Sequence, residues 1–143
     1  MEGYNKILVC LDGSEVSEAV LLEVEKIATA FNAGISLLRV AHAITILPGT
    51  DPTEAQVAVV RKAEEYLSGI EEELKTRGFM VDSHVRYGDP AEQILDHCEW
   101  NEVDIIAMST HGRSGVKRWL LGSVAEKILR HATKPVFLMK SSG

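Results

Sequence analysis

The residues best suited to chemistry gather between positions 108 and 126. Gly112 and Gly115 allow a loop conformation and a close ligand approach that other residues hinder. Ser123 and Glu126 have the spacing of a capping box at the start of an amphipathic helix. Because a helix N-terminus attracts anions, this stretch is typical of a phosphate site, although a surface loop before a capped helix would look similar. Four basic side chains lie nearby without an intervening acid: His111, Arg113, Lys117 and Arg118.

Composition limits the classes of protein to consider. The 143 residues suit one domain, residues 1–143, with an ordinary apolar share of 45%. A net charge of -6 argues against nucleic acid as a partner. There is no apolar run long enough for a membrane span and no signal-like start, so we expect a cytoplasmic protein without a membrane partner. Cys10 and Cys98 are expected to be buried thiols, not a disulfide framework.

Short apolar runs alternate with helical patterns along the chain. The predicted order is β-α-β-α-β-α-β-α-β, which indicates an α/β fold with a doubly wound parallel sheet and right-handed crossovers. Residues 79–87 and 134–140 are expected to be edge strands. Strands are predicted at 6–11, 35–41, 79–87, 104–108 and 134–140, and helices at 14–31, 51–78, 89–101 and 123–131.

The predicted sheet also indicates where a ligand would bind. Such sheets bind ligands at the carboxyl ends of strands, where the strand order reverses. Asp12 follows the first predicted strand, and the stretch that contains Gly112 and Gly115 follows the fourth. If these strands are neighbours, both features face one crevice, which favours nucleotide binding. The alternative is that Asp12 simply caps the first helix or turn.

Four segments carry a resemblance to a known family: 6–14 (KILVCLDGS), 109–115 (STHGRSG), 121–126 (LGSVAE) and 134–136 (KPV). Over essentially its full length the chain resembles a universal stress protein of the UspA type, in its ATP-binding subgroup. The resemblance implies a single-domain, open, parallel five-stranded sheet of order 3-2-1-4-5 with helices on both faces. This is a Rossmann-like fold similar to that of the adenine nucleotide alpha hydrolases.

ATP-binding members of that family carry Gly, two residues, Gly, nine residues, Gly, then Ser or Thr. Gly112, Gly122 and Ser123 fit the later positions, whereas Ser109 stands in place of the first glycine. Serine is small, and its hydroxyl could still face a ligand. If this position needs only a small residue, Ser109→Gly should leave affinity equal or higher.

The resemblance implies roles for particular residues. Asp12 would accept bonds from ribose or adenine, Val40 would offer backbone groups to adenine, and the later glycines would bind phosphate. Arg113 could add charge on physical grounds, or belong to a solvated face. Val40 and Met108 would be strand residues in any case. The expected ligand is ATP, ADP or AMP, with Mg²⁺ bridging phosphate oxygens. The nucleotide-binding set is Cys10, Leu11, Asp12, Val40, Met108, Ser109, Gly112, Arg113, Gly122, Ser123 and Val124.

Three functions remain open at this point. The first is a stress-response regulatory protein that changes its partner surface with nucleotide bound and has no enzymatic role. The second is a slow ATPase or phosphotransferase, for which only Asp12 or His111 offers a base near the glycines. The third is an interaction protein that binds no nucleotide. We also expect a homodimer through the apolar edge from Pro135 to Lys140, and an unspecified protein partner.

Overall fold

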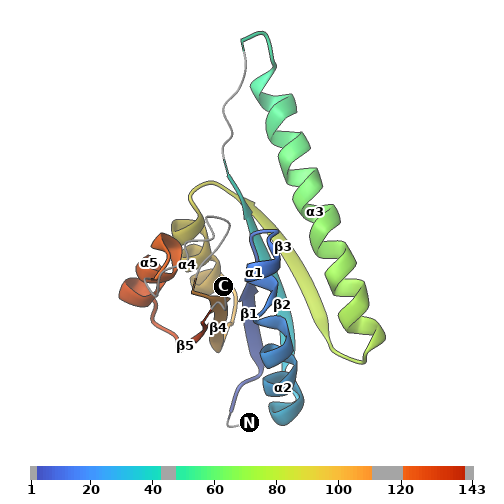
Figure 1. Cartoon of the computed structure of the whole chain (residues 1–143), viewed down its shortest axis with the longest axis vertical. Helices are drawn as coiled ribbons and strands as arrows, with labels where there is room; N and C mark the ends of the chain where they lie inside the picture. The colour runs from blue at the N-terminus through green and yellow to red at the C-terminus, as the bar shows by residue number, and fades with distance from the viewer. Residues whose placement is uncertain (1–2, 43–47, 111–120, 141–143) are drawn as a thin grey trace.

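A computed structural model of the chain describes residues 3–42, 48–110 and 121–140. Strands and helices alternate along it as predicted (Figure 1). The strands are β1 (Lys6–Cys10), β2 (Gly34–Ala41), β3 (Val81–Tyr87), β4 (Ile105–Ser109) and β5 (Val136–Met139). The helices are α1 (Glu15–Glu18), α2 (Leu21–Phe31), α3 (Pro52–Thr76), α4 (Pro90–Trp100) and α5 (Ser123–His131).

The strands form one parallel sheet in the order β3-β2-β1-β4-β5. This confirms the predicted order and places β3 and β5 at the two edges. Val9 of β1 lies beside Leu37 on one neighbouring strand and Ala107 on the other. The central strand β1 therefore has its carboxyl end between those of β2 and β4, and the strand order reverses there.

Two apolar cores cover the two faces of the sheet. Ile7 and Val9 of β1 join the core beneath α2 and α3, whereas Leu8 and Cys10 join the core beneath α4 and α5. Figure 1 shows these helix pairs on opposite sides of the sheet. Alternate side chains of one strand thus enter different cores, which explains why β1 and β4 read as nearly continuous apolar runs.

Local signals set the ends of several helices as predicted. The Asp51 carboxylate accepts the Thr53 N–H at 2.8 Å at the start of α3, and Asp89 accepts the Glu92 N–H at 3.1 Å at the start of α4. A proline occupies the first turn in both cases. Asn32 ends α2 with a left-handed φ of 55°.

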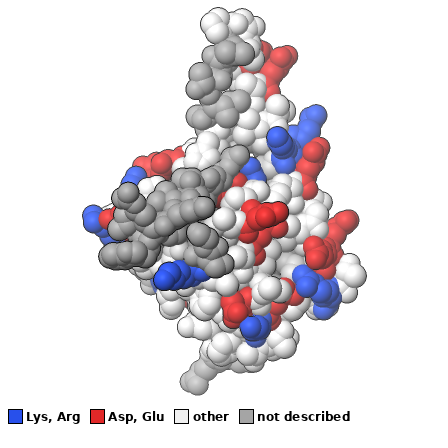
Figure 2. Space-filling model, in the orientation of Figure 1, with Lys and Arg blue, Asp and Glu red and all other residues white. Residues whose placement is uncertain are grey.

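Charged side chains lie mainly on solvent-facing surfaces. In Figure 2, acidic and basic side chains are interspersed along the side of the molecule where α2 and α3 lie. Glu71 and Lys75 form an ion pair at 2.6 Å, one turn apart on α3. Within the described ranges, no helix has both the length and the apolar character needed to cross a membrane.

The prediction of one continuous helix over 14–31 was wrong. The structure has two helices, α1 and α2, separated at residues 19–20. The Ser109 hydroxyl donates to the Val16 carbonyl at 2.8 Å, and in a continuous helix this carbonyl would accept the Val20 N–H. At the end of α2, Phe31 is 39% exposed and contacts the Tyr4 ring.

The predicted capping box at the start of α5 was also wrong. Gly122 is the N-cap residue, and Ser123 is the first residue of the helix. The Gly122 carbonyl accepts the Glu126 N–H at 2.9 Å, while the Gly122 N–H donates to the Thr110 carbonyl at 2.8 Å. The second bond ties this turn to the end of β4, so the cap falls one residue earlier than the Ser-x-x-Glu pattern suggested.

Candidate functional site

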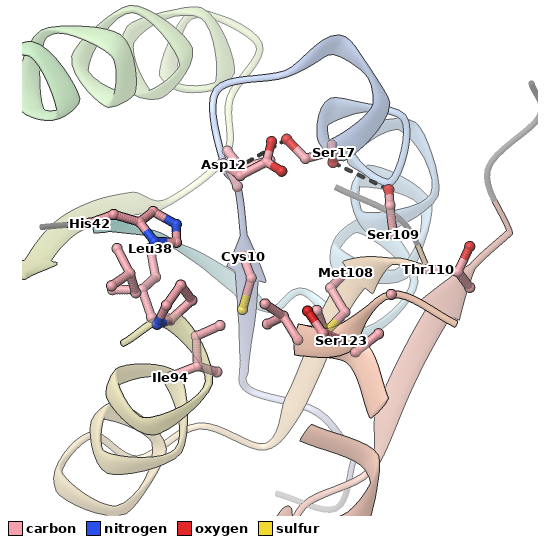
Figure 3. A pocket seen from close by; sticks show the side chains of 16 residues that line it. Cys10, Asp12, Ser17, Leu38, His42, Ile94, Met108, Ser109, Thr110 and Ser123 are labelled. Carbon is pink, nitrogen blue, oxygen red and sulfur yellow. Dashed lines mark hydrogen bonds between the residues drawn. The ribbon is translucent and has the colours of Figure 1, made fainter. Parts of the chain in front are cut away.

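A pocket of about 240 Å³ opens at the carboxyl ends of β1 and β4 (Figure 3). Its volume is near the lower end for small-molecule sites, roughly 300 Å³. The sheet order reverses at this point, where open α/β folds bind their ligands. The lining residues are Cys10, Leu11, Asp12, Ser17, Leu38, Val40, His42, Pro90, Ile94, Met108, Ser109, Thr110, Gly122, Ser123, Val124 and Ala125.

One end of the pocket is largely apolar. Leu38 and Val40 come from β2, and Pro90 and Ile94 come from the first turns of α4. Figure 3 shows Leu38 and Ile94 near one another, with the exposed His42 beside them. These side chains offer van der Waals contacts to a flat apolar group. The two ring nitrogens of His42 add polar atoms at the edge of the pocket.

The other end is polar, and Asp12 occupies its upper wall in Figure 3. Asp12 Oδ1 accepts both the backbone N–H of Ser14, at 2.9 Å, and the Ser14 hydroxyl. The Asp12 N–H donates to Ser17 Oγ at 3.2 Å. The expected alternative role of Asp12 in a turn is therefore present, and the same residue also lines the pocket.

The turn after Asp12 requires glycine. Gly13 has φ +90°, and a Cβ there would lie 2.0 Å from the Arg39 guanidinium. The Arg39 guanidinium lies 5.0 Å from the centre of the Tyr66 ring on α3, and the Tyr66 hydroxyl donates to Glu18 at 2.8 Å. The β1–α1 turn is therefore supported from behind by side chains of β2 and α3.

The first turn of α5 forms the wall opposite Asp12. Ser123, Val124 and Ala125 line the pocket from this turn, where backbone N–H groups lack partners within the helix. Helix α5 has nine residues, and its N-terminus carries the partial positive charge of the helix dipole. The pocket thus combines a carboxylate on one side with anion-attracting amides on the other.

The two cysteines near this site are neutral thiols. Burial, with a smaller contribution from Cys98, raises the pKa of Cys10 far above its ordinary range. Burial likewise raises the pKa of Cys98 to about 11. Since the thiolate is the nucleophilic form, Cys10 contributes an apolar surface to the pocket and is unsuited to covalent chemistry.

Most of the sequence-predicted residues come together in this pocket. Gly112 and Arg113 lie outside the described residues, as do His111, Lys117 and Arg118. The Ser109 side chain differs from expectation, because its hydroxyl bonds to α1 instead of facing a ligand. The predicted residues that line the pocket are Cys10, Leu11, Asp12, Val40, Met108, Ser109, Gly122, Ser123 and Val124.

Sequence reasoning missed part of the lining. His42 follows β2 as Asp12 follows β1, so the rule that ligands bind at strand ends could have identified it. Pro90 begins the helix after β3 and could have been found in the same way. Thr110 directly follows β4 and could have been found by the same rule. The other missed residues carry no such signal, since they lie within helices or a strand: Ser17, Leu38, Ile94 and Ala125.

The strand order and the pocket at its reversal place the chain in the class of open, doubly wound α/β proteins. The sequence profile of the universal stress protein family matches residues 3–140. The chain therefore belongs to the universal stress protein family.

Individual relatives agree with this assignment. Universal stress protein MJ0577 from Methanocaldococcus jannaschii is 30% identical over 154 residues, covering 96% of this chain and 95% of that protein. Its solved structure has a TM-score of 0.85 and covers 98% of both chains. YxiE from Bacillus subtilis is 28% identical over 147 residues, covering 96% of this chain and 99% of that protein. A family member from Arabidopsis thaliana, solved with AMP bound, shares the fold at 21% identity and TM-score 0.71, covering 97% and 93% of the two chains.

Proposed function

We propose that the protein binds an adenine nucleotide in the pocket between β1 and β4. One observation carries the proposal. The pocket has an apolar end, a carboxylate at Asp12 and a helix N-terminus at Ser123, and a nucleotide has a base, a sugar and a phosphate in that order. Each part of the ligand then meets the chemistry that suits it.

The base and the sugar would occupy the end near β2. Val40 and Ile94 give the adenine ring apolar contacts, and the backbone at Val40 offers polar groups to the adenine edge. Cys10 and Leu11 continue this surface, and Met108 and Ser109 flank the ribose. The Asp12 carboxylate accepts hydrogen bonds from ribose hydroxyls or adenine.

The phosphates would lie at the start of α5. The N–H groups of Ser123 and Val124 and the Ser123 hydroxyl can donate to phosphate oxygens. By the family pattern, Gly112 completes this cradle and Arg113 adds positive charge. The Gly122 N–H is engaged with the Thr110 carbonyl, so Gly122 would contribute space for the phosphates and not a donor. Mg²⁺ would accompany ATP by bridging phosphate oxygens, with few ligands from the protein. AMP and ADP would use the same cradle with fewer contacts.

The AMP in the Arabidopsis relative supports the proposal only in a general way. That protein is 21% identical, so the likeness concerns the fold. The bound AMP shows that this fold accommodates an adenine nucleotide. In this chain, the pocket residues themselves support binding of such a ligand.

We infer a regulatory role in the stress response in the cytoplasm, not an efficient enzymatic one. Asp12 Oδ1 already accepts two hydrogen bonds from Ser14, and the Cys10 thiol is neutral. Neither group suits activation of water for phosphoryl transfer. A nucleotide that binds without rapid turnover can instead change the surface offered to a protein partner.

We also propose a homodimer through β5. This strand is at the edge of the sheet, and Val136, Phe137, Leu138 and Met139 are all only partly buried. An apolar edge has unpaired backbone groups that a second copy can pair with. Pairing around a two-fold axis would bury the same residues from both chains.

The binding proposal is tested by calorimetry on the wild-type protein with ATP, ADP and AMP, with and without Mg²⁺. Mass spectrometry of small molecules released from the purified protein identifies any nucleotide carried from the cell. GTP serves as the control for base recognition, and tripolyphosphate as the control for phosphate alone. A folded protein that binds none of the adenine nucleotides at millimolar concentration would contradict the proposal.

A further inference from the structure

We propose that Ser109 is a positioning residue that fixes the Asp12 side of the pocket through α1. The inference rests on the proposed function and extends it to a residue that departs from the family's nucleotide motif. Ser109 is the last residue of β4 and is only 6% exposed. Ser109 lines the pocket, while its hydroxyl donates to a carbonyl of α1.

The contacts of the hydroxyl are specific. Ser109 Oγ donates to the Val16 carbonyl at 2.8 Å, and lies 3.4 Å from the Ser17 carbonyl. These two carbonyls are at the end of α1, where the helical ladder is interrupted before α2. The Ser109 hydroxyl thus supplies a donor to helix-end carbonyls that lie away from water.

A short chain of bonds leads from this contact to Asp12. Ser17 Oγ accepts the Asp12 N–H at 3.2 Å, and the Ser17 N–H donates to Ser14 Oγ at 3.1 Å. The Ser14 hydroxyl in turn donates to the Asp12 carboxylate. Figure 3 shows Asp12, Ser17 and Ser109 linked along one wall of the pocket.

This arrangement predicts a particular pattern of effects. Loss of the Ser109 hydroxyl frees the end of α1, and with it the turn that orients Asp12. The contacts made by the nucleoside should weaken, while those made by phosphate at Ser123 on α5 should not change. A role in overall stability alone would not separate these two ends of the ligand.

Ser109→Ala removes the hydroxyl, and Ser109→Cys replaces it with a weak donor on a slightly larger side chain. Ser36→Ala is the matched control. Ser36 is a buried strand serine, 1% exposed, whose hydroxyl donates to Asp82 at 2.6 Å, and it does not line the pocket. All four proteins are compared by calorimetry with adenosine and with tripolyphosphate, and by amide hydrogen exchange without ligand.

We expect both Ser109 variants to bind adenosine roughly three- to tenfold more weakly, the loss of about one hydrogen bond, with tripolyphosphate affinity unchanged. Amides of residues 14–19 should exchange faster in both variants, and Ser36→Ala should show neither effect. Unchanged adenosine affinity, or unchanged exchange over 14–19, would overturn the inference while leaving nucleotide binding intact. A wild-type protein that binds neither probe would overturn the proposed function itself.

Discussion

The imidazole rings of His84 on β3 and His97 on α4 lie with their centres 4.9 Å apart. His97 is 3% exposed, and its Nδ1 lies 3.3 Å from the side-chain nitrogen of Asn101. Its Nε2 is buried and has no hydrogen-bond partner among the described residues. The two histidines lie between the edge strand β3 and the helix α4 that covers it. A positive charge on His97 would therefore disturb the packing of α4.

We expect acid to destabilise the fold through His97. Burial lowers the pKa of His97 from 6.5 to about 4, with smaller contributions from the charges of His84, Arg86 and Lys6, against which Asp82 acts. The unfolded chain therefore binds a proton between about pH 6.5 and 4 that the folded chain does not. The contribution of His97 to the free energy of unfolding is fully present above pH 6.5. It falls as the pH drops towards 4, by at most about 3 kcal/mol. Urea unfolding across this range measures the loss.

His97→Gln separates this effect from that of the carboxylates. Glutamine does not titrate, and its side-chain oxygen can accept a bond from Asn101. The variant should be less stable than the wild type near neutral pH and should lose less stability on acidification. Parallel pH profiles of the two proteins would show that His97 does not carry the acid sensitivity.

Gly122→Val should block nucleotide binding. Gly122 has φ -66°, which any residue can adopt, so the expected loss comes from a branched side chain filling the phosphate space. Gly122→Ser, which keeps a good N-cap residue with a small side chain, is the control. Calorimetry with ATP decides, after thermal unfolding has shown that both variants fold. Wild-type affinity in Gly122→Val would place the phosphates elsewhere.

ATP turnover should be far below the typical enzyme rate of about 10 per second. The sequence has no P-loop lysine, and the Asp12 carboxylate is engaged with Ser14. Phosphate release in the presence of Mg²⁺ measures the rate, with Asp12→Ala as the comparison. Robust hydrolysis that disappears in Asp12→Ala, with binding retained, would instead identify an ATPase.

The sheet could be predicted from sequence because its signals are local. Continuous apolar runs, and caps such as Asp51 and Asp89, each depend on a few adjacent residues. The break between α1 and α2 coincides instead with a hydrogen bond to Val16 from the Ser109 hydroxyl, which belongs to a strand 93 positions further along the chain. No pattern within 14–31 contains that information.

The pocket was predictable to the extent that it follows from strand order. Asp12 and Ser123, both predicted to bind a ligand, line the pocket because they lie at strand or helix ends near the carboxyl edge of the sheet. The apolar end was missed, since Leu38 and Ile94 read as ordinary core residues. Only the packing of α4 beside β2 shows that they also line a cavity.

The dimer proposal predicts that Leu138→Lys yields a monomer. A lysine on an apolar edge strand opposes pairing with a second copy. Leu129→Lys is the matched control, because Leu129 is on α5, is 45% exposed and is outside β5. Light scattering at micromolar concentration should give a dimer mass for the wild type and for Leu129→Lys. A monomer mass for the wild type would contradict the proposal.

Ser123→Ala should weaken nucleotide binding with little loss of stability. The sequence pattern predicted a helix cap at Ser123, whose removal would cost roughly 1 kcal/mol. The structure instead places Ser123 as the first residue of α5, after the N-cap residue Gly122. Because Ser123 lines the pocket, we expect its hydroxyl to contact phosphate, and its replacement by a good helix former should change stability by less than about 0.5 kcal/mol.

Asp89→Ala provides the comparison for Ser123→Ala, because Asp89 does cap α4 through its bond to the Glu92 N–H. Its removal should cost about 1 kcal/mol of stability. Urea unfolding of both variants, together with calorimetry of Ser123→Ala with ATP and adenosine, completes the test. ATP affinity should fall and adenosine affinity should not, since only ATP carries the phosphates that the Ser123 hydroxyl would contact. An equal loss for both ligands would mean that Ser123 acts on the pocket as a whole.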